Sequence, residues 1–529
     1  MSRLRTAAII GAVSLPLIAG GFLAENHANR DGARLFDQVL NIVSDRFVDT
    51  LDTGALYEKA ARGLVHELQD PYSELFSPKQ LQQFSTRTNG RYGGIGMMIE
   101  DQQGAIVVSQ VFPNTPASQA GVQSGDRIIQ VDSNSTRGWK LSQVSDSLTG
   151  VPGTQVNVHF ARPGVTEPIA VKFTRATIHV PAIEYAIMLD GKVGYVPLQQ
   201  FNETAATELA TSVKSLINQG AKGIIIDLRD DPGGILDEAL ASSNLFLKDG
   251  QEIASVRGRG SEPQVYVAKG TPLVPTTPLI ILTNGYTASA SEIVAGALQD
   301  HDRALIVGTT SFGKGLVQTL FPLDGGWALK VTTAKWYTPS GRSIQKERKL
   351  LPDGELVEVK PDSLEADSVK RNRPAYKSDQ GRIVYGGGGI TPDVIVHDDT
   401  ITTAEQQFVK AIAPKFQAFY AVLSSFALSL KPQLPGPAFT VNPAWRDELY
   451  QKLQAAGVTV DRKLYDQGAP WIDRQIEFRA ASLAYGDSTA RRHEVAYDAP
   501  LRTALDLFKR GQTQRELFSI ASATRGKTR

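Results

Sequence analysis

The sequence predicts a multidomain protein of mixed α/β and α+β class, and three observations lead to this prediction. The chain has 529 residues, which is too long for one small core. Residues 35–84 and the chain after residue 400 carry apolar residues at helical spacing, whereas short apolar strands and glycine turns fill residues 89–177. From about 183 to 345, short apolar strands alternate with helical stretches. We expect a helical N-terminal segment, a small β domain, an α/β core and a helical C-terminal region.

The composition excludes several classes of function. Hydrophobic residues make up 41% and charged residues 21% of the chain, as in ordinary globular proteins. A net charge of +1 gives no electrostatic reason to expect a nucleic acid partner. The chain has no cysteine, which excludes disulfides, thiol catalysis and thiolate metal sites. The seven histidines show no metal-ligand spacing, and we read His301, between two aspartates, as a solvated turn. We expect no metal and no cofactor.

Residues 1–30 are predicted to be an export signal or a membrane anchor. Arg3 and Arg5 precede an apolar stretch at residues 6–24, the order found in export signals. Residues 19–21 are small enough for cleavage but do not form a clean Ala-x-Ala site. The stretch is near the lower length limit of a membrane span, so an uncleaved anchor in contact with the membrane is the alternative. The basic flank disfavours a buried core helix. We expect a periplasmic protein, or one anchored to face the periplasm or the outside.

Residues 31–84 are predicted to be a helical segment. Apolar residues recur at helical spacing at Phe36, Val39, Leu40, Val43 and Phe47. A second run covers residues 56–68, and Asp70-Pro71 then ends the helix.

Glycines punctuate residues 85–177. Tyr92-Gly-Gly-Ile-Gly96 leads into an apolar strand, and Gly121-Val122 and Gly125-Asp126-Arg127-Ile128-Ile129 follow. This stretch resembles a PDZ domain, a β-sandwich-like fold, and Gly93, Gly94, Ile95 and Gly96 match that family's carboxylate-binding loop. Successive N–H groups in a glycine turn can hold a terminal carboxylate, while the neighbouring strand edge pairs with an extended peptide. The simpler interpretation is that these glycines only form a tight turn.

The α/β core is predicted over residues 178–400. We expect strands at 193–198, 223–228 and 279–283, and helices at 204–217 and 235–245. Residues 347–382 are charged and poor in hydrophobics, which predicts an insertion or a mobile flap. Residues 401–529 are predicted to be a mainly helical region with a proline-rich linker at 431–437, and to mediate oligomerisation, dock a partner or shield the site.

Two short motifs indicate hydrolytic chemistry. Thr287-Ala-Ser-Ala-Ser-Glu292 places Ser289 between an apolar strand and a helix, and Ser311-Phe-Gly-Lys-Gly315 places Lys314 in a glycine turn. A serine at a strand-to-helix turn and a lysine from a nearby loop are what a Ser–Lys hydrolase needs. The lysine must be neutral to act as base, and burial near Phe312 would favour that form. Gln318, four residues on, would orient the lysine if this stretch is helical or turn-like.

An oxyanion hole is predicted beside the serine. The N–H of Ala290, the residue after the nucleophile, is the natural first donor. A second would come from Leu228-Arg-Asp-Asp-Pro-Gly-Gly234, where Gly233 allows close backbone approach. Asp230 and Asp231 invite a carboxylate-pair mechanism, but the following Pro-Gly-Gly favours a structural turn. Ser289 as a mere helix N-cap and Ser291 as the nucleophile are the alternatives for the serine motif.

Several long motifs, in order, resemble the carboxyl-terminal processing peptidases, also called tail-specific proteases. They are Leu228-Arg-Asp-Asp-Pro-Gly-Gly, the run from Thr287 to Leu298, Asp302-Arg-Ala, Phe312-Gly-Lys-Gly, Val317-Gln and the run from Tyr337 to Gln345. The resemblance implies Ser289 as nucleophile, Lys314 as general base and Gln318 as the orienting residue. It also implies an oxyanion hole lined by Gly233 and the Ala290 N–H, with Asp300 in a supporting role.

This resemblance implies an exported serine endopeptidase that captures protein or peptide C-termini through a PDZ domain, which moves to open or assemble the site. An activating adaptor protein and a homo-oligomer are further partners that it leaves open. The alternative is a PDZ-containing scaffold whose protease domain is inactive or partner-gated, although both Ser289 and Lys314 are present. An acyl-CoA enzyme with a similar core would not explain the PDZ domain.

Overall fold

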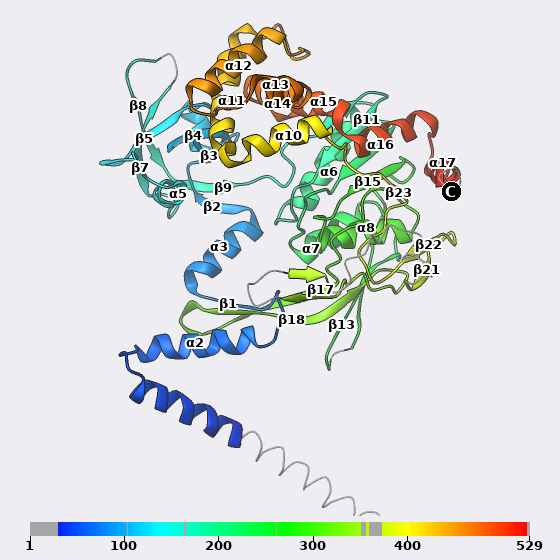
Figure 1. Cartoon of the computed structure of the whole chain (residues 1–529). Coiled ribbons are helices and arrows are strands. Elements are labelled where there is room, and N and C mark those ends of the chain that lie inside the picture. Colours follow the sequence, from blue (N-terminus) through cyan, green and yellow to red (C-terminus); the bar gives the residue numbers. More distant parts are fainter. Residues whose placement is uncertain are drawn as a thin grey trace, which may run out of the picture. The chain divides into compact units, whose positions relative to one another are not determined.

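The computed structural model describes residues 30–102, 104–162, 165–260, 262–350, 356–358 and 373–525. The predicted export signal or anchor therefore lies outside the described residues except for Arg30, as does the middle of the predicted insertion. The chain divides into two compact units (Figure 1). The first contains the described residues up to Pro78, Gln318–Thr332, Leu350 and Leu356, and the second contains the others.

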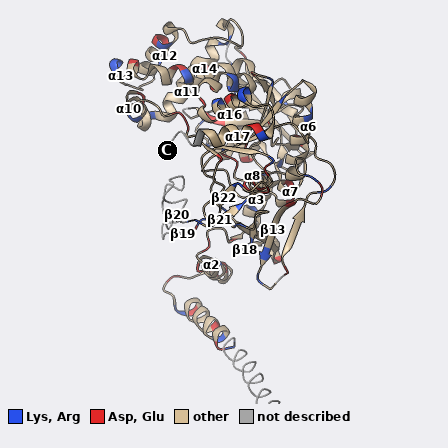
Figure 2. Ribbon diagram, turned by 90° about the vertical axis from the view of Figure 1, so that its right-hand side faces the viewer, with Lys and Arg blue, Asp and Glu red and all other residues tan. Residues whose placement is uncertain are grey.

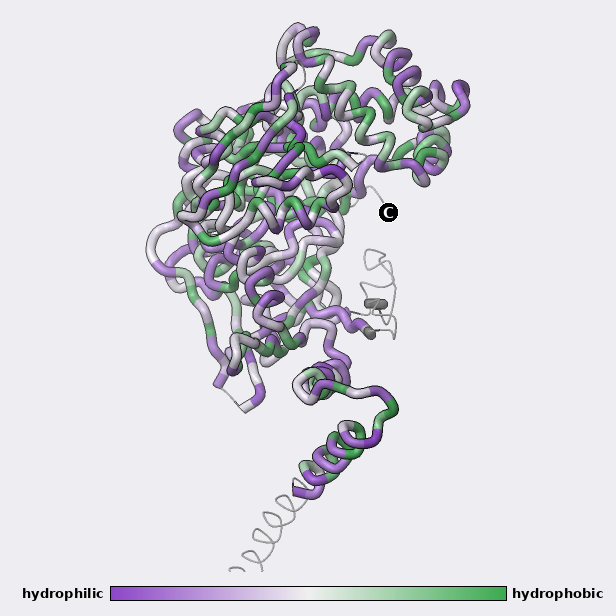
Figure 3. Tube along the Cα trace, turned by 90° about the vertical axis from the view of Figure 1, so that its left-hand side faces the viewer, coloured by the Kyte–Doolittle hydropathy of each residue, from purple (hydrophilic) through white to green (hydrophobic). Residues whose placement is uncertain are grey.

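The first unit is mostly helical. Residues 30–46 form one helix and α2 (Thr53–His66) a second, capped by Asp52, whose carboxylate accepts the Ala55 N–H at 2.8 Å. Large side chains of the first helix, such as Phe36 and Ile42, are exposed, and Figure 3 shows hydrophobic and hydrophilic residues interleaved along it.

The prediction of an all-helical segment up to residue 84 missed a strand in this unit. β1 (Glu74–Phe76) pairs antiparallel with Ala328–Lys330 at the start of β18 (Ala328–Tyr337). Three residues are too few to show a period in the sequence, so only the distant partner reveals this strand.

The domain predicted to resemble a PDZ domain opens the second unit. After α3 (Pro78–Asn89), six strands form one antiparallel sheet, in the order β3-β4-β5-β7-β8 with β6 beside β5. They are β3 (Met97–Gln102), β4 (Ala105–Val111), β5 (Arg127–Val131), β6 (Asn134–Ser135), β7 (Gln155–Ala161) and β8 (Ile169–Thr174), with helices α4 (Pro116–Gln119) and α5 (Leu141–Leu148). The entering strand β2 (Arg91–Gly94) pairs with the leaving strand β9 (Ala176–His179), so both connections of the domain run together.

The α/β core is built on a six-stranded sheet. Its order is β10 (Ile187–Leu189), β11 (Val193–Pro197), β12 (Gly223–Asp227), β15 (Leu279–Thr283), β16 (Leu305–Gly308) and β23 (Val394–Ile395), parallel except for β10. On one face it packs against α6 (Ala205–Asn218), α7 (Leu236–Asn244) and α8 (Ala290–Asp300). The strands β11, β12 and β15 and the helices α6 and α7 lie within two residues of their predicted bounds, because long apolar runs carry a strong signal.

The other face of this sheet is covered by the end of the chain. α16 (Ala499–Arg510) and α17 (Gln514–Arg525) place Leu501, Leu505 and Phe518 against the sheet (Figure 1). These helices belong to the layered core, although the sequence predicted them as part of a separate helical region.

Further strands lie outside the six-stranded core sheet. In the second unit, the end of β18 pairs with β13 (Glu252–Gly258), which also pairs with β14 (Gln264–Val267). The remaining short elements are β17 (Leu316–Pro322), η1 (Asp324–Gly326), β19 (Arg348–Leu350), β20 (Leu356–Glu358), β21 (Ala375–Lys377) and β22 (Ile383–Tyr385).

The C-terminal boundary predicted for the flap at 347–382 was placed too far along the chain. β21 and β22 form a hairpin, and Arg382 between them is paired with Asp302 and Asp393, both buried. A buried ion pair fixes this end of the segment to the core, which its charged composition alone could not reveal.

The remaining C-terminal elements form a helical region with its own core. They are α10 (Thr403–Ile412), η2 (Ala413–Lys415), α11 (Phe416–Leu430), η3 (Lys431–Gln433), α12 (Pro443–Ala455), α13 (Arg462–Gln467), α14 (Ala469–Tyr485), α15 (Asp487–Glu494) and η4 (Val495–Tyr497). Arg479 of α14 reaches Glu100 of β3 at 2.6 Å. Basic and acidic residues are interspersed along the ribbon in Figure 2.

Among the described residues, one stretch, Thr403–Gln433, is long and apolar enough to cross a membrane, with a mean hydropathy of 1.2. A 3-10 turn breaks it between α10 and α11. Phe408, Phe419 and Leu423 from this stretch are buried in the core of the helical region. Core helices meet the same criterion of length and composition, and 33% of the apolar window is buried here, so the stretch is only weak evidence of a membrane span.

Candidate active site

Ser289 lies at the turn from β15 into α8 with φ 55° and ψ −112°. This backbone conformation is strained for a residue with a Cβ, and such strain is typical of a nucleophilic serine presented between a strand and a helix. Ser289 is half-buried, whereas every residue of α8 is buried. An N-cap serine with no other role would normally take an extended conformation, so the geometry favours the nucleophile interpretation.

Ser291, the competing nucleophile, is fully buried. Its hydroxyl donates to the backbone oxygen of Asp231 at 3.1 Å. It therefore ties α8 to the neighbouring loop and is not presented to a substrate.

The Glu292 carboxylate joins the serine turn to the lysine loop. One oxygen accepts the Ser289 N–H and the Lys314 N–H, both at 2.8 Å. The other accepts the Ser311 hydroxyl and the Gly313 N–H, both at 2.6 Å. Burial raises the pKa of Glu292, and these donors work against that rise. One buried side chain thus fixes both predicted catalytic segments.

Lys314 is half-buried in the loop between β16 and β17. Its backbone oxygen accepts the indole N–H of Trp336 at 3.0 Å, and the preceding Phe312 donates its N–H to Thr287 at 2.9 Å. Both ends of the lysine loop are therefore anchored, one of them to the serine motif itself.

Gln318 lies in β17, so the expectation of a helical or turn-like stretch after Lys314 was wrong. Its amide donates to the Thr332 hydroxyl of β18 at 3.2 Å. β17 pairs with β18, and this pairing with a distant segment holds Gln318 in a strand.

The loop after β12 lies against the serine turn. Gly233 has φ 90°, and a Cβ there would lie 2.6 Å from the Ala288 oxygen and 2.7 Å from the Ala290 nitrogen. Only glycine allows this approach. The Gly233 N–H donates to the Asp231 carboxyl at 2.8 Å, a bond that sequence reasoning did not anticipate.

Asp231 and Asp230 behave differently, which disfavours a carboxylate pair. Asp231 is buried, its backbone oxygen accepts the Ala288 N–H at 3.0 Å, and burial raises its pKa to about 8. Asp230 is exposed and accepts the Asn284 side-chain amide at 2.9 Å. The stretch is a structural turn, as its Pro-Gly-Gly ending indicated.

Arg229, in the same loop, was not singled out from the sequence. Its guanidinium binds Asp227 at 2.6 Å and Asp498, at the start of α16, at 2.7 Å. Arg491 of α15 also binds Asp498 at 2.5 Å. Burial alone would raise the pKa of Asp227, but Arg229 and Arg491 hold it below its ordinary value.

Asp300, at the end of α8, is buried and holds the turn that follows β18. Its carboxylate accepts the Thr338 hydroxyl at 2.5 Å and the Ser340 N–H at 3.0 Å, and pairs with Arg342 at 2.7 Å. These contacts are those of a residue that supports the fold around the site.

In the described part of the chain, no group of three His, Asp or Glu side chains is arranged to hold a metal ion. The ring of His301 instead binds the Asp379 carboxylate at 2.8 Å and the Glu252 backbone oxygen at 2.7 Å.

Comparison with known proteins decides the family. A model of peptidase family S41 matches residues 192–362, and a PDZ domain model matches residues 107–162. The carboxy-terminal-processing protease of Bartonella bacilliformis is 38% identical over 346 residues, which cover 64% of this chain and 79% of that protein. The chain belongs to the carboxy-terminal processing proteases.

Other relatives carry the same name. The carboxy-terminal processing protease CtpA of Bacillus subtilis is 34% identical, covering 65% of this chain and 73% of that protein. Among solved structures, a photosystem II D1 C-terminal processing protease is 27% identical, covers 68% of this chain and 85% of that chain, and has a TM-score of 0.36. The resemblance read from the motifs is confirmed, and this protein is a serine-type peptidase with a PDZ domain.

In this protease, the predicted carboxylate-binding loop borders a groove of about 790 Å³. Gly93, Ile95 and Gly96 line it, whereas Gly94 is buried and pairs with Ala176 in β9. The opposite walls come from α5 and from α3, whose polar face (Lys79, Gln82, Gln83, Thr86 and Arg87) also lines the groove. The contribution of α3 was not foreseen, because nothing in its sequence places it beside the PDZ domain.

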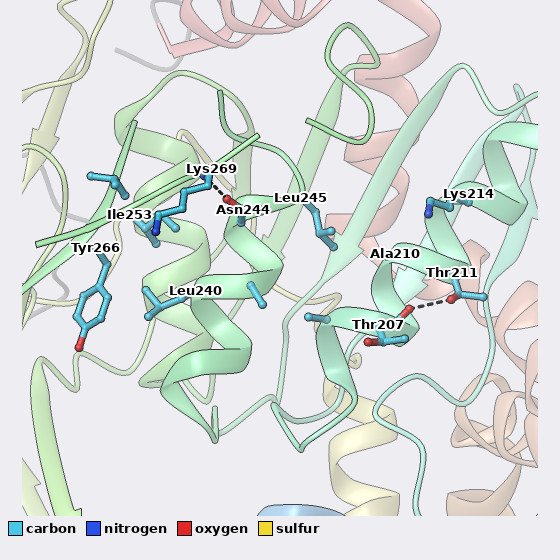
Figure 4. Close-up of a pocket in the computed structure, with 13 residues that line it drawn as sticks. Thr207, Ala210, Thr211, Lys214, Leu240, Asn244, Leu245, Ile253, Tyr266 and Lys269 are labelled. Carbon is cyan, nitrogen blue, oxygen red and sulfur yellow. Dashed lines mark hydrogen bonds between the residues drawn. The ribbon is translucent and has the colours of Figure 1, made fainter. Parts of the chain in front are cut away.

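A second groove, of about 580 Å³, lies between α6, α7 and β14 (Figure 4). Leu240, Leu245 and Tyr266 line it, and it contains none of the predicted site residues.

Proposed function

We propose that this protease hydrolyses peptide bonds with Ser289 as nucleophile and Lys314 as general base. Gln318 as the residue that orients the lysine is proposed from the family resemblance alone, because β17 lacks the helical spacing that would place it beside Lys314. The observation that supports this proposal best is the Glu292 carboxylate, which binds the backbone N–H groups of both Ser289 and Lys314. A shared anchor of this kind holds nucleophile and base in one constant geometry, which is the main requirement of an activated serine.

The proposed reaction is acyl transfer. The neutral Lys314 amine takes the proton of the Ser289 hydroxyl, whose oxygen attacks the scissile carbonyl carbon. The Ala290 N–H stabilises the oxyanion, and Gly233 lines the other side of the hole. Lys314 then gives its proton to the leaving amine. Water, deprotonated by the same amine, hydrolyses the acyl-enzyme and regenerates Ser289. Asp300 supports the surrounding turn without touching the substrate.

We assign Gly233 a role of shape as well as of hydrogen bonding. The Gly233 N–H donates a hydrogen bond to Asp231. This N–H therefore binds an oxyanion only by sharing or exchanging that bond. Its missing side chain leaves room beside Ala290 in either case.

The PDZ groove is proposed to capture protein or peptide C-termini, through the loop of Gly93, Gly94, Ile95 and Gly96. Gly96 has φ 87°, which turns the chain between β2 and β3, and with Gly93 and Ile95 it lines the groove where a carboxylate would bind. The edge of β3 then pairs with the extended tail.

We propose export as the setting of this activity. The basic and apolar N-terminal sequence supports a periplasmic location, or an anchor that faces the periplasm or the outside. An activating adaptor and a homo-oligomer stay predictions from the family resemblance.

The test is cleavage of an unfolded model protein by the full-length chain, purified in detergent, beside Ser289→Ala and Lys314→Ala. We expect cleavage by the native chain and loss in both variants, with tail-peptide binding kept. Activity in Ser289→Ala would refute the assigned nucleophile. Absence of cleavage from all three, with peptide binding intact, would support the partner-gated scaffold.

The capture step has its own test. Binding of one fluorescent tail peptide is compared with its C-terminally amidated form. Weaker binding of the amide is expected, because amidation removes the carboxylate charge. Equal binding of the two forms would refute the carboxylate nest.

A further inference from the structure

We infer that Asp498, from the C-terminal helical region, is a positioning residue for the oxyanion-hole loop and acts on it through Arg229. The inference rests on the proposed function, since it assigns the stretch from Arg229 to Gly234 to the oxyanion hole. It adds to the catalytic core a residue that lies more than two hundred positions beyond the serine in the sequence.

The first step concerns the loop itself. Arg229 lies four residues before Gly233, and the residues on its two sides, Leu228 and Asp231, are both tied to the serine motif. Thr287 donates its hydroxyl to the Leu228 backbone oxygen at 2.7 Å, and Ala288 donates its N–H to Asp231 at 3.0 Å. A displacement of Arg229 is therefore passed to the residues that border Ser289.

The second step is the geometry around Arg229. One edge of its guanidinium binds both oxygens of Asp227, with its Nε at 2.9 and 3.2 Å. The two terminal nitrogens bind both oxygens of Asp498, at 2.9 and 2.7 Å. This planar fork between two carboxylates fixes the direction of the side chain, which a single contact would not do.

The third step is burial and charge. The side chains of Arg229, Asp227 and Asp498 are only 11%, 7% and 8% exposed. Arg491 adds the second cation, and the Tyr195 hydroxyl donates to Asp227 at 2.7 Å. Arg491 also pairs with the more exposed Glu494 at 2.9 Å. Asp498 is the buried anion that both arginines share with Asp227, so loss of its charge leaves two buried cations with one buried anion, Asp227.

The fourth step is the origin of Asp498. It is the N-cap of α16, where its carboxylate accepts the Leu501 N–H at 2.9 Å. Leu501 is fully buried against the sheet, so the packing of α16 sets the place of Asp498. The C-terminal helices thereby set the position of a loop that lines the active site.

The test compares kcat and KM of the full-length chain with those of Asp498→Asn and of the control Asp399→Asn. Asparagine keeps an N-cap but removes the charge. Asp399 pairs with Arg502 of the same helix at 2.7 Å but is exposed. We expect kcat of Asp498→Asn to fall at least about tenfold and up to about a hundredfold, with KM and tail-peptide binding nearly unchanged. The control should keep the native kcat.

A double-mutant cycle with Arg229→Gln separates positioning from a general structural defect. If Asp498 acts through Arg229, the double variant has the kcat of Arg229→Gln alone. Multiplied losses in the double variant, or a native kcat in Asp498→Asn, would overturn the inference. If Asp498→Asn does not fold, Arg229→Lys replaces it, since lysine keeps the charge but not the fork. An unchanged kcat there would overturn the inference as well.

The same kinetic assay includes Ser289→Ala, which separates the proposed function from the proposed role of Asp498. Cleavage by Ser289→Ala refutes the proposed function, whatever Asp498→Asn does. An inactive Ser289→Ala beside a fully active Asp498→Asn refutes only the role of Asp498.

Discussion

At the scale of single residues, two buried carboxyl groups organise the site without touching the bond that is cleaved. Glu292 accepts four hydrogen bonds from the two catalytic segments, while Asp231 accepts the Gly233 N–H and lies beneath the serine turn. A buried carboxylate is costly unless its oxygens are satisfied, and the four donors satisfy both oxygens of Glu292, so Glu292 holds them firmly.

The first prediction concerns Glu292→Gln. Glutamine keeps the shape but turns an amide NH₂ toward N–H donors, so one pair of contacts becomes repulsive. We expect a fall in kcat of about tenfold or more and a loss of roughly 1–3 kcal/mol in the free energy of unfolding. Steady-state kinetics and urea unfolding measure both.

The matched control is Glu516→Gln at the exposed N-terminus of α17, where Glu516 accepts the Gln512 N–H at 2.7 Å. Its kcat should equal that of the native chain. A native kcat in Glu292→Gln itself would contradict the role given to Glu292.

The second prediction concerns pH and Asp231. Its folded-state pKa is raised from 3.8 to about 8, so the folded state holds a proton that the unfolded chain has lost across this window. This contribution to stability is complete below pH 3.8 and is lost as the pH rises through about 8. Asp231→Asn mimics the protonated form. It should flatten the decline of the unfolding free energy between about pH 5 and about pH 9.

Urea unfolding at several pH values measures this slope, with Asp230→Asn as the control. Asp230 is exposed in the same motif, so its variant should follow the native chain. Identical slopes for Asp231→Asn and the native chain would show that Asp231 does not carry the proton.

At the scale of elements, the site depends on three turns that meet: the serine turn before α8, the lysine loop before β17 and the glycine loop after β12. Each turn is short and follows a buried parallel strand. The carboxyl ends of these strands lie at the same edge of the sheet, so the three turns begin there. Hydrogen bonds between the turns, rather than within them, fix their mutual positions.

The third prediction tests the glycine loop with Gly233→Ala. The new Cβ would stand 2.7 Å from the Ala290 nitrogen, so the oxyanion donor must move. We expect kcat to fall by about a hundredfold or more, with tail-peptide binding retained. The control is Gly250→Ala, which also has positive φ (80°) but meets nothing within 4 Å.

Gly250→Ala should lose some stability and keep its kcat, because strain without a clash does not reach the site. Equal kcat values for the two alanine variants would argue against Gly233 as part of the oxyanion hole.

At the scale of the molecule, the second unit joins the helical region, the PDZ domain and the protease core. The C-terminal helices α16 and α17 form one of the two helical layers on the sheet, and α14 contacts the PDZ domain. The region that the motifs did not cover therefore packs against both the core sheet and Glu100 of the PDZ domain.

The fourth prediction follows for Leu501→Ala in α16. Leu501 is fully buried among strands of the core sheet, so its loss leaves a cavity. The free energy of unfolding should fall by about 2–5 kcal/mol. Urea unfolding measures this loss, with protease activity as the signal of the folded state. The exposed Arg510→Ala on the same helix serves as the control. An unchanged unfolding midpoint for Leu501→Ala would mean that α16 folds apart from the protease core.

The sequence by itself determined the family and the fold class, and it predicted the segments of the site. Glycine turns after apolar runs are local features, so the positions of Ser289, Lys314 and Gly233 could be read from neighbouring residues. Local patterns failed at β1, at β17 and at the end of the flap, where a distant partner decides the conformation.

Only the tertiary structure decided what holds these segments together. Glu292 reaches residues about twenty positions away, and Arg229 reaches Asp498 across 269 positions. No periodicity or spacing links groups so far apart. Their contact depends on the packing of α8 and α16 on the two faces of one sheet, and buried charges then pair because the interior leaves them no water.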